Sequence, residues 1–364
     1  MIEILLILIL WLFVLLQILV MAGYFSGNPK VKSERSNPKV AIIIAARNEE
    51  ANIEACLQSI LQLNYPQELI EVWIGNDRST DHTSSLIEKF IFGRSNFNLF
   101  QIECELGSAK AKGNVLAQLI KQTQSEYIFV TDADITVAPN WIKHLLPYLL
   151  QSKIGIVSGT TLVDGNNFFA KWQGIDWSLG NGNLIGLDRL GLKSTAVGNN
   201  MCFTKQAYLA TGGYENMPFS VTEDFQLFKA IRANGYESVN VLDKASLNIS
   251  VAQNNFRNFL HQRKRWMIGA QDLPTYWLLI FGLQASFYPC LFFLLLVHTK
   301  LAFIIWVIKV ILQLFYIGLI QKKLKVKWHW PTFLTYEFYS VFIHFAMIGF
   351  YLYPVKMDWK ERTY

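Results

Sequence analysis

The chain has 364 residues, enough for one large domain or two ordinary ones. Hydrophobic residues make up 52% of it and are concentrated towards its two ends, which predicts an aqueous domain between membrane segments. The net charge of +6 is too small to indicate a polynucleotide partner, so we expect no nucleic acid. The four cysteines lack metal-binding spacing, which is typical of packed thiols in a reducing compartment.

The N-terminal segment Ile4–Ala22 is apolar except for Gln17 and is long enough to cross a hydrocarbon core of roughly 30 Å. A cleavable signal peptide would begin with basic residues, but the only early charge is Glu3. Basic residues follow the segment instead, at Lys30, Lys32, Arg35 and Lys39. This order predicts an uncleaved anchor over residues 1–25 and a following domain in the cytoplasm.

Residues 39–250 alternate short apolar runs with amphipathic stretches. The runs predict strands at Val40–Ala45, Leu69–Gly75, Phe97–Glu103 and Tyr127–Thr131. The stretches between them predict helices at Asn52–Leu63, Asp81–Phe90 and Asn114–Lys121. The alternation predicts an α/β domain with a parallel-rich sheet, in which ligands bind beyond the carboxyl ends of the strands.

The remaining chain has the pattern of a membrane protein. Residues 251–272 suit an amphipathic helix at the membrane surface, and residues 273–364 hold apolar segments at about 274–297, 301–320 and 331–355. Three full crossings after one anchor would place the basic tail outside the cell. A first segment broken at Gly282 and Pro289 would return the tail to the cytoplasm, and the sequence leaves both topologies open.

Two acidic clusters follow predicted strands. Asp132 and Asp134, separated by Ala133, can hold a hard divalent cation together with the phosphates of a ligand, although acids in a solvated loop give the same pattern. Asp77 can accept hydrogen bonds from a base or a ribose, while Thr80 or Asp81 caps the next helix.

Three other clusters have both a structural and a functional interpretation. The loop Gly107–Gly113, which contains Lys112, is either a flexible basic loop or a receptor for a diphosphate. The acids of Thr222–Asp224 either favour the start of a helix or supply a general base. The cluster Gln262–Trp266 either anchors a helix at the membrane or binds a diphosphate and a sugar.

Taken in order, these clusters resemble glycosyltransferase family 2, in its membrane-integrated branch of lipid glucosyltransferases and polysaccharide synthases. The resemblance covers about residues 39–270 and the flanking membrane segments. The matching motifs are Ala45–Glu50, Asn76–Ser79, Asp132–Asp134, Gly198–Gly213, Thr222–Asp224 and Gln262–Trp266. The sequence departs from the family pattern at Asn76, which replaces the first acid of an Asp-Asp pair, and at Thr204-Lys205, where a basic pair is frequent.

The resemblance implies a GT-A (Rossmann-like) transferase fold plus transmembrane helices, with a role for each matching residue. Asp224 would be the catalytic base, and Asp134 would ligate Mg²⁺ or Mn²⁺. The nucleotide-sugar donor would be bound by Arg47, Glu49, Asp77, Lys112, Asp132 and Arg265. The acceptor would be bound by Glu223, Gln262 and Trp266.

The resemblance further implies an inverting, metal-dependent hexosyltransferase that moves a sugar from a nucleotide-sugar to a lipid or lipid-linked acceptor, and we expect a UDP-sugar as the donor. We expect an integral membrane protein, of the inner membrane in a bacterium, with a cytoplasmic catalytic domain. A processive polysaccharide synthase is the alternative, because Gln-x-x-Arg-Trp is frequent in those enzymes. An inactive transferase-like membrane scaffold stays open as a third interpretation.

Charged residues inside predicted membrane segments are unusual and need a partner or a function. Lys309 lies within the second C-terminal segment, and Glu337 and His344 lie within the last one. We expect a structural Lys309–Glu337 pair, with contact to a lipid phosphate as the alternative.

Overall fold

The computed structural model describes residues 2–31, 37–193, 195–270, 273, 275–352, 358–359 and 362–363. It divides into two compact units. The sheet unit comprises Asn28–Val163 and Thr195–Val251, and the helical unit comprises Met1–Gly27, Asp164–Ser194 and Ala252–Tyr364. Residues 164–194, which we placed inside the transferase domain, therefore go with the helical unit. The expected basic residues Lys32 and Arg35 lie outside the described residues.

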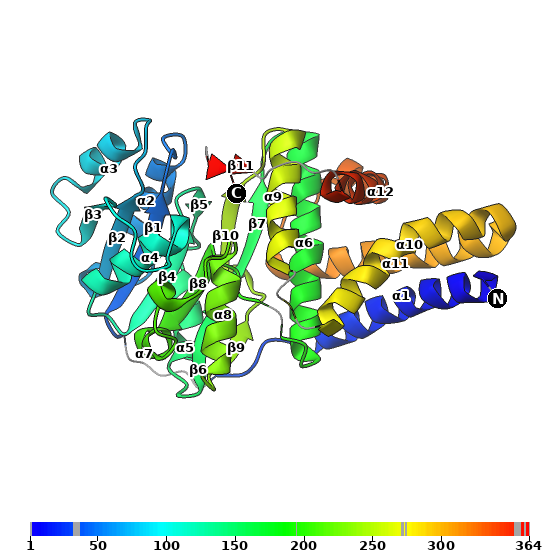
Figure 1. Ribbon diagram of the computed structural model, residues 1–364, viewed down its shortest axis with the longest axis horizontal. Helices are drawn as coiled ribbons and strands as arrows, with labels where there is room; N and C mark the ends of the chain where they lie inside the picture. The colour runs from blue at the N-terminus through cyan, green and yellow to red at the C-terminus, as the bar shows by residue number, and fades with distance from the viewer. Residues whose placement is uncertain are drawn as a thin grey trace. The chain divides into compact units, whose positions relative to one another are not determined.

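The sheet unit is built on a seven-stranded mixed sheet of order β3-β2-β1-β4-β8-β6-β9 (Figure 1). Strands β3, β2, β1 and β4 are parallel, and β8 runs antiparallel to both β4 and β6. Their bounds are β1 Val40–Ala46, β2 Ile70–Asn76, β3 Phe97–Gln101, β4 Tyr127–Asp132, β6 Ile154–Ser158, β8 Asn200–Thr204 and β9 Glu237–Asn240. The four strands expected from the sequence are the four parallel ones.

Strand β1 is central because all seven of its residues are apolar and it is covered on both faces. Ile42 and Ile44 are fully buried in a core that includes Leu57 of a neighbouring helix. The parallel register sets Ala46 beside Asn76 of β2 and Ala45 beside Asp132 of β4. The carboxyl ends of the three strands therefore lie at one edge of the sheet.

Helices surround this sheet, and a small second sheet of order β5-β10-β7 adjoins it. The helices are α2 Ile53–Leu61, α3 Thr83–Ile91, α4 Ala111–Gln122, α5 Trp141–Leu149, α7 Lys205–Ala210 and α8 Glu223–Ala233. The small strands are β5 Ile135–Thr136, β7 Thr160–Asp164 and β10 Leu247–Val251. Three short 3₁₀ turns cover Gln67–Leu69, Tyr214–Asn216 and Lys244–Ser246. The helices predicted at 52–63, 81–90 and 114–121 are confirmed as α2, α3 and α4.

One buried amide connects several of these elements. Asn200 at the start of β8 accepts a hydrogen bond from the Trp141 indole at 2.8 Å. Its amide nitrogen donates to the carbonyl oxygens of Thr160 at 2.7 Å and Ser246 at 2.9 Å. Because every polar atom of this fully buried side chain is used, Asn200 fixes the distance between α5, β7 and β8.

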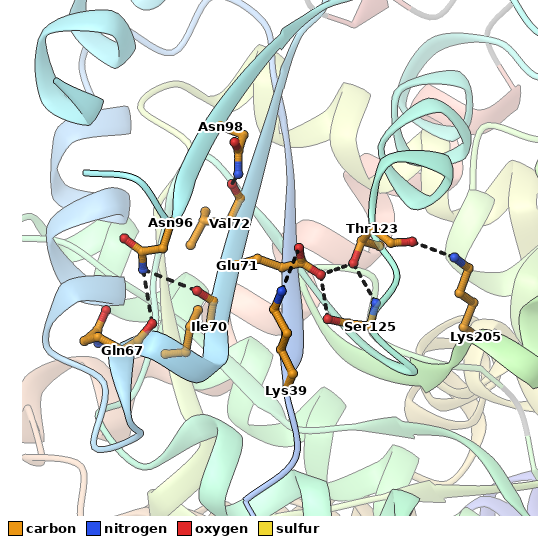
Figure 2. Close-up of polar contacts among 10 residues, drawn as sticks. All are labelled: Lys39, Gln67, Ile70, Glu71, Val72, Asn96, Asn98, Thr123, Ser125 and Lys205. Carbon is orange, nitrogen blue, oxygen red and sulfur yellow. Dashed lines mark hydrogen bonds and ion pairs between the residues drawn. The ribbon is translucent and has the colours of Figure 1, made fainter. Parts of the chain in front are cut away.

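The amino end of the sheet carries a second polar cluster, centred on Glu71 of β2 (Figure 2). Its carboxylate accepts hydrogen bonds from Ser125 Oγ at 2.5 Å and from the Thr123 hydroxyl, and Lys39 Nζ lies 3.7 Å away. Lys205 in turn donates to the Thr123 carbonyl oxygen at 2.5 Å. Burial alone would raise the pKa of Glu71, but the two hydroxyls and Lys39 outweigh it and lower that pKa.

Glu71→Gln should therefore destabilise the protein in a pH-dependent way. The lowered pKa means that the ionised carboxylate stabilises the fold above the unfolded pKa of about 4.3, and this contribution is lost as the pH falls through the folded pKa. We expect a loss of about 1–2 kcal/mol at pH 7 and a smaller loss at pH 3. Thermal unfolding of the solubilised full chain at both pH values measures it, with the exposed Glu68→Gln as the matched control.

The helical unit contains six helices among the described residues. They are α1 Ile2–Phe25, α6 Phe168–Arg189, α9 Phe256–Gly269, α10 Thr275–Val297, α11 Thr299–Leu324 and α12 Trp330–Leu352. By length and composition, α1, α10, α11 and α12 could each cross a membrane. A two-residue pairing of β11 Asp358–Trp359 with β12 Arg362–Thr363 follows α12.

Of the two alternatives that the sequence leaves open for the segment at 274–297, the structure has the unbroken one. The structure has one continuous helix, α10, with Pro289 inside it and Gly282 in open space. Helices α1, α10 and α11 run lengthwise beside one another in Figure 1, whereas α12 is seen nearly end-on. Within this unit α12 therefore crosses the direction shared by α1, α10 and α11.

Glycines allow α1 and α6 to approach at backbone distance. A Cβ atom on Gly23 would strike the Gly186 carbonyl oxygen, and one on Gly186 would strike the carbonyl of Val20. Farther along α6, the Gly182 carbonyl oxygen accepts a hydrogen bond from the Tyr316 hydroxyl of α11 at 2.5 Å. Small residues at such crossings are typical of helix packing in membranes.

Two smaller expectations have opposite outcomes. The predicted Lys309–Glu337 pair is confirmed, with 2.6 Å between Nζ and Oε2. The prediction that all four cysteines are packing residues is wrong for Cys104, which is exposed, while the other three are buried.

Candidate active site

The loops after β1 and β2 are held together by backbone contacts. Arg47 Nη1 donates to the Asp77 carbonyl oxygen at 2.8 Å, and the Asp77 amide donates to Ala46 at 2.9 Å. The Thr80 amide donates to Asn48 Oδ1 at 2.9 Å. Arg47 and Asp77, both expected at the nucleotide, are thereby fixed side by side at the carboxyl edge of the sheet.

Glu49 and Asp77 are both only 6% exposed at this edge. The Glu49 carboxylate accepts a hydrogen bond from Asn52 at 3.0 Å, and the Glu49 amide donates its hydrogen to Thr83 Oγ1 at 2.7 Å. Asp81 Oδ1 accepts from the Thr83 amide at 3.0 Å. Asp81 thus interacts with the first residue of α3.

Asp132 and Asp134 lie on the turn that follows β4, above a buried thiol. Cys56 of α2 donates to the Asp132 carbonyl oxygen at 3.5 Å. Burial raises the pKa of the Cys56 thiol, and the carboxylates of Asp134, Asp132 and Glu49 raise it further. Carboxylates from two different strand ends are therefore close enough to act on one sulfur atom.

Lys112 bridges two carboxylates from distant parts of the chain. Its ammonium lies 2.5 Å from Asp132 Oδ1 and 2.9 Å from Glu223 Oε1. Burial by itself would lower the pKa of Lys112, but Asp132 and Glu223, with a smaller contribution from Asp224, raise it. The side chain is therefore a permanent cation inside an acidic cluster.

Asp224 lies in the first turn of α8 and faces a glycine. Its Oδ2 accepts from the Gly198 amide at 2.9 Å, and its Oδ1 accepts from the Phe225 amide at 2.8 Å. A Cβ atom at position 198 would lie 2.6 Å from Oδ2 and 2.7 Å from the Asp224 Cβ. Any side chain at Gly198 would therefore displace the carboxylate.

The surroundings of Asp224 make it a stronger base than an ordinary aspartate. Burial and the neighbouring Glu223 raise the pKa of Asp224 to about 6, against the lowering effect of Lys112 and of two backbone amides. Such a carboxylate is ionised at neutral pH and accepts a proton more readily than one with a pKa near 4. It has the properties that a general base requires.

Three expected site residues, Gln262, Arg265 and Trp266, lie on α9 in the helical unit. The Trp266 ring packs edge-on against Trp177 of α6, with 5.4 Å between centroids. The Arg263 guanidinium lies 4.6 Å from the centre of the Trp266 ring and pairs with Asp176. Arg263 thus has a structural role, and one face of Trp266 is occupied by protein.

The other expected residues all lie in the sheet unit, and the structure brings several of them together. Lys112 connects Asp132 to Glu223, and Asp224 follows directly in α8. Asp77 is separated from Asp132 by one strand, β1, which places their backbones roughly 10 Å apart. Residues expected to bind the donor, to bind the acceptor and to act as base therefore meet at one edge of one sheet.

In the part of the chain that the structure describes, no group of three or more His, Cys, Asp or Glu side chains is arranged to hold a metal. The described residues therefore fit Mg²⁺ or Mn²⁺ in one binding mode only. In that mode, one or two carboxylates hold the ion and the phosphates of a substrate complete its coordination shell. Asp134, with Asp132 beside it, offers that donor set.

The sheet, the long helices and the rim of carboxylates correspond to a known fold. The chain resembles a solved structure described as mannosyltransferase PcManGT from Pyrobaculum calidifontis in complex with GDP-Man and Mn²⁺. The TM-score is 0.57 at 16% identity, and 97% of each chain is covered. The fold is GT-A with additional helices, as the sequence predicts.

A family model described as glycosyl transferase family 21 matches residues 4–364. The chain belongs to this family. The match extends over both units, so the family includes the helices α1 and α10–α12 as well as the carboxylate-rich sheet.

Two kinds of synthase are among the curated relatives of this family 21 chain. The chain is 27% identical over 255 residues to the β-monoglucosyldiacylglycerol synthase of Synechocystis sp., covering 66% of this chain and 50% of that protein. It is 26% identical over 322 residues to the poly-β-1,6-N-acetyl-D-glucosamine synthase of Staphylococcus epidermidis, covering 86% and 72%. The chain spans about half the length of the glucosyldiacylglycerol synthases that it matches. Both kinds belong to the membrane-integrated group that the motifs resemble.

Sequence analysis missed two residues that shape the site of this family 21 chain. Cys56 lies under the acidic turn, and the buried Tyr214 lies near Glu223 and Asp224, whose charges add to the effect of burial in raising the pKa of the tyrosine. Cys56 could have been found from its position, since it lies on the inner face of the first predicted helix beside the strand ends. Tyr214 has no comparable signal, because a 3₁₀ turn brings it there.

Asp224→Asn should stabilise the fold above neutral pH. The raised pKa means that the native state holds a proton between about pH 4 and 6 that the unfolded chain has lost, so the ionised Asp224 lowers stability above pH 6. We expect the variant to gain about 1 kcal/mol at pH 8 and nothing below pH 4. Thermal unfolding at both pH values measures the gain; a variant less stable than the parent at pH 8 would contradict it.

Proposed function

We propose that this protein transfers a sugar from a nucleotide-sugar, a UDP-sugar, to a lipid or lipid-linked acceptor, with inversion at the sugar carbon. The observation that carries the proposal is the Lys112 bridge between Asp132 and Glu223, next to Asp224. It groups a donor-side acid, an acceptor-side acid and a base with a raised pKa at the edge where α/β sheets bind ligands.

Asp224 is the proposed base. Its carboxylate takes the proton of an acceptor hydroxyl, and the resulting oxygen attacks the anomeric carbon opposite the departing nucleoside diphosphate. The hydrogen bonds from Gly198 and Phe225 hold the carboxylate in one orientation. One base with an in-line displacement inverts the configuration at that carbon.

The donor side of the proposal uses the loops after β1, β2 and β4. Arg47, Glu49 and Asp77 surround the nucleoside, Asp132 faces the ribose or the sugar, and Asp134 binds Mg²⁺ or Mn²⁺. When bound, the divalent ion neutralises charge that grows on the leaving diphosphate. When the donor binds, its diphosphate competes with Asp132 and Glu223 for the Lys112 ammonium, so Lys112 is proposed to bind this diphosphate too. Arg265 is proposed to assist.

The acceptor is proposed to be a lipid because the described part of the chain contains four helices that could cross a membrane. Glu223, Gln262 and Trp266 are the residues proposed to contact it. A processive polysaccharide synthase is the second candidate, favoured by a similarity to the poly-β-1,6-N-acetyl-D-glucosamine synthase that extends over 86% of this chain. The two differ in product, since one gives a single glycolipid and the other a series of chain lengths.

Asp224→Asn should abolish transfer and leave donor binding nearly intact. Loss of a general base lowers kcat/KM by about 10²–10⁴. In the unmodified protein the transfer rate should fall as the pH drops below about 6, because Asp224 becomes protonated. Membranes supplied with a panel of radiolabelled UDP-sugars and Mg²⁺, followed by lipid extraction, measure the product, and binding of UDP to the purified protein measures the donor site.

Asp243→Asn is the matched control, because Asp243 lies in the same unit and accepts a hydrogen bond from the Ala245 amide at 2.9 Å. It should keep the transfer rate of the parent. Turnover retained by Asp224→Asn would overturn the assignment of the base. A ladder of chain lengths would favour the polysaccharide synthase, and the absence of any UDP-sugar turnover by the parent, hydrolysis included, would favour the inactive scaffold.

The proposed orientation places the sheet unit in the cytoplasm. Three crossings by α1, α10 and α11, with α12 along the membrane surface, return the basic C-terminal tail to the cytoplasmic side. The crossing direction of α12 supports this arrangement (Figure 1). The apolar side chains on the outward face of α12 also support it, since Leu334, Phe338 and Phe345 are 63%, 70% and 47% exposed.

A fluorescent-protein fusion after Tyr364 tests the topology in a bacterial host. We expect fluorescence, because that reporter folds only in the cytoplasm, and no activity from an alkaline phosphatase fused at the same position. Truncated fusions after His298, between α10 and α11, are the control and should give the opposite pair of results. Phosphatase activity at the C-terminus would instead support four full crossings.

A further inference from the structure

The helical unit contains a cavity of about 190 Å³ that the proposed chemistry does not use. Side chains from α1, α6, α10, α11 and α12 line it. At roughly 30 Å³ per water molecule, it has room for a group the size of about six waters. Its polar lining consists largely of amides and hydroxyls, namely Gln17, Asn183, Gln284, Gln313, Tyr288 and Ser340.

Gln17 is the most unusual member of this lining. It is the single polar side chain in the apolar core of α1, and its Oε1 atom is buried without a hydrogen-bond partner among the described residues. Burying an unsatisfied amide oxygen is unfavourable. A donor from a bound molecule would satisfy this oxygen.

The charged groups at the cavity are already compensated. Lys309 pairs with Glu337 at 2.6 Å, and the same carboxylate accepts hydrogen bonds from Gln313 at 3.1 Å and Tyr288 at 3.1 Å. Asp176, the other charged residue of the lining, pairs with Arg263 of α9 and accepts from Tyr336. A phosphate would bring negative charge into this site without a surplus cation to balance it.

The remaining polar groups suit an uncharged partner. An amide offers both a donor and an acceptor, and a hydroxyl needs both. His344 lies 2.9 Å from the Ala285 carbonyl oxygen through Nε2, so that nitrogen carries the hydrogen and the ring is occupied on that side. Apolar side chains such as Leu16, Leu179 and Leu312 complete the wall and suit hydrocarbon next to the polar group.

We propose that this cavity binds the uncharged, hydroxyl-bearing headgroup of a lipid, with Gln17 accepting a hydrogen bond from it. The lipid comes from one of two sources, the acceptor of the transfer reaction or a resident lipid of the helical unit. Only its role as acceptor rests on the proposed function. Binding itself needs neither a donor nor a metal.

Native mass spectrometry of the full chain in detergent tests the proposal, with 1,2-dioleoylglycerol as the probe and dioleoylphosphatidate as the charged comparison. We expect saturable binding of one dioleoylglycerol and weaker binding of the phosphatidate. Gln17→Leu should weaken dioleoylglycerol binding about three- to tenfold, the effect of one hydrogen bond. Ser340→Ala should act in the same direction and serves as a second, smaller change.

Gln321→Leu is the matched control. Gln321 is a buried glutamine on α11 whose Oε1 also has no hydrogen-bond partner among the described residues, but it does not line the cavity. The control should bind dioleoylglycerol like the parent. The proposal is overturned if phosphatidate binds as tightly as dioleoylglycerol, or if Gln17→Leu and Ser340→Ala both bind like the control.

Addition of UDP-sugar and Mg²⁺ to the bound complex separates the two sources. A bound dioleoylglycerol that gains the mass of one sugar identifies the cavity as an acceptor site. A bound lipid that persists unchanged while transfer proceeds identifies a resident lipid. If the parent protein binds the lipid but transfers no sugar to any acceptor, the result counts against the proposed function and leaves the cavity assignment unchanged.

Discussion

One ammonium group holds the acidic edge of the sheet together. Lys112 contacts Asp132, at the end of β4, and Glu223, at the start of α8. Without it, several carboxylates would converge in a poorly solvated site, and like charges that close repel one another strongly. Because Lys112 belongs to α4, which packs against the central strands, the cation is fixed in place before any ligand arrives.

The same cation leaves Asp224 with the properties of a base. Burial and Glu223 raise the pKa of Asp224, and Lys112 keeps it from rising further, so that it stays near 6. Without that cation the pKa would be higher still, and a fully solvated carboxylate would have little affinity for a proton. The pKa of Asp224 is thus set by desolvation, which raises it, and by the charge of Lys112, which lowers it.

Carboxylates exceed cations at the sheet edge, whereas the charges at the cavity of the helical unit are paired one to one. At the sheet edge, Asp132, Glu223 and Asp224 surround Lys112, and Glu49 and Asp134 lie near the Cys56 thiol beside Asp132. Carboxylates therefore outnumber cations in this cluster. Inside the helical unit, Lys309 and Arg263 are each matched by one carboxylate. The first arrangement suits the proposed divalent ion, whose charge would offset that of a diphosphate, whereas the second suits uncharged groups.

The sequence by itself determined the parallel half of the sheet and the order of the motifs. Strand β1 is apolar throughout, and only a strand buried on both faces has that pattern. The acids after β1, β2 and β4 had to share an edge once the strands were parallel. Apolar stretches of about 20 residues likewise revealed α1, α10 and α11.

Only the tertiary structure decided which charges are paired. Lys112 and Glu223 are more than a hundred residues apart, and no local pattern indicates that they touch. Helix α6 was missed because its polar and apolar residues have no clear period, and its glycines acquire meaning only through contact with α1. The continuity of α10 could not be decided from the sequence, because a proline within a long helix is tolerated when neighbouring helices pack around it. Local sequence fixes which faces are apolar, but ion pairs and helix crossings depend on contacts between distant segments.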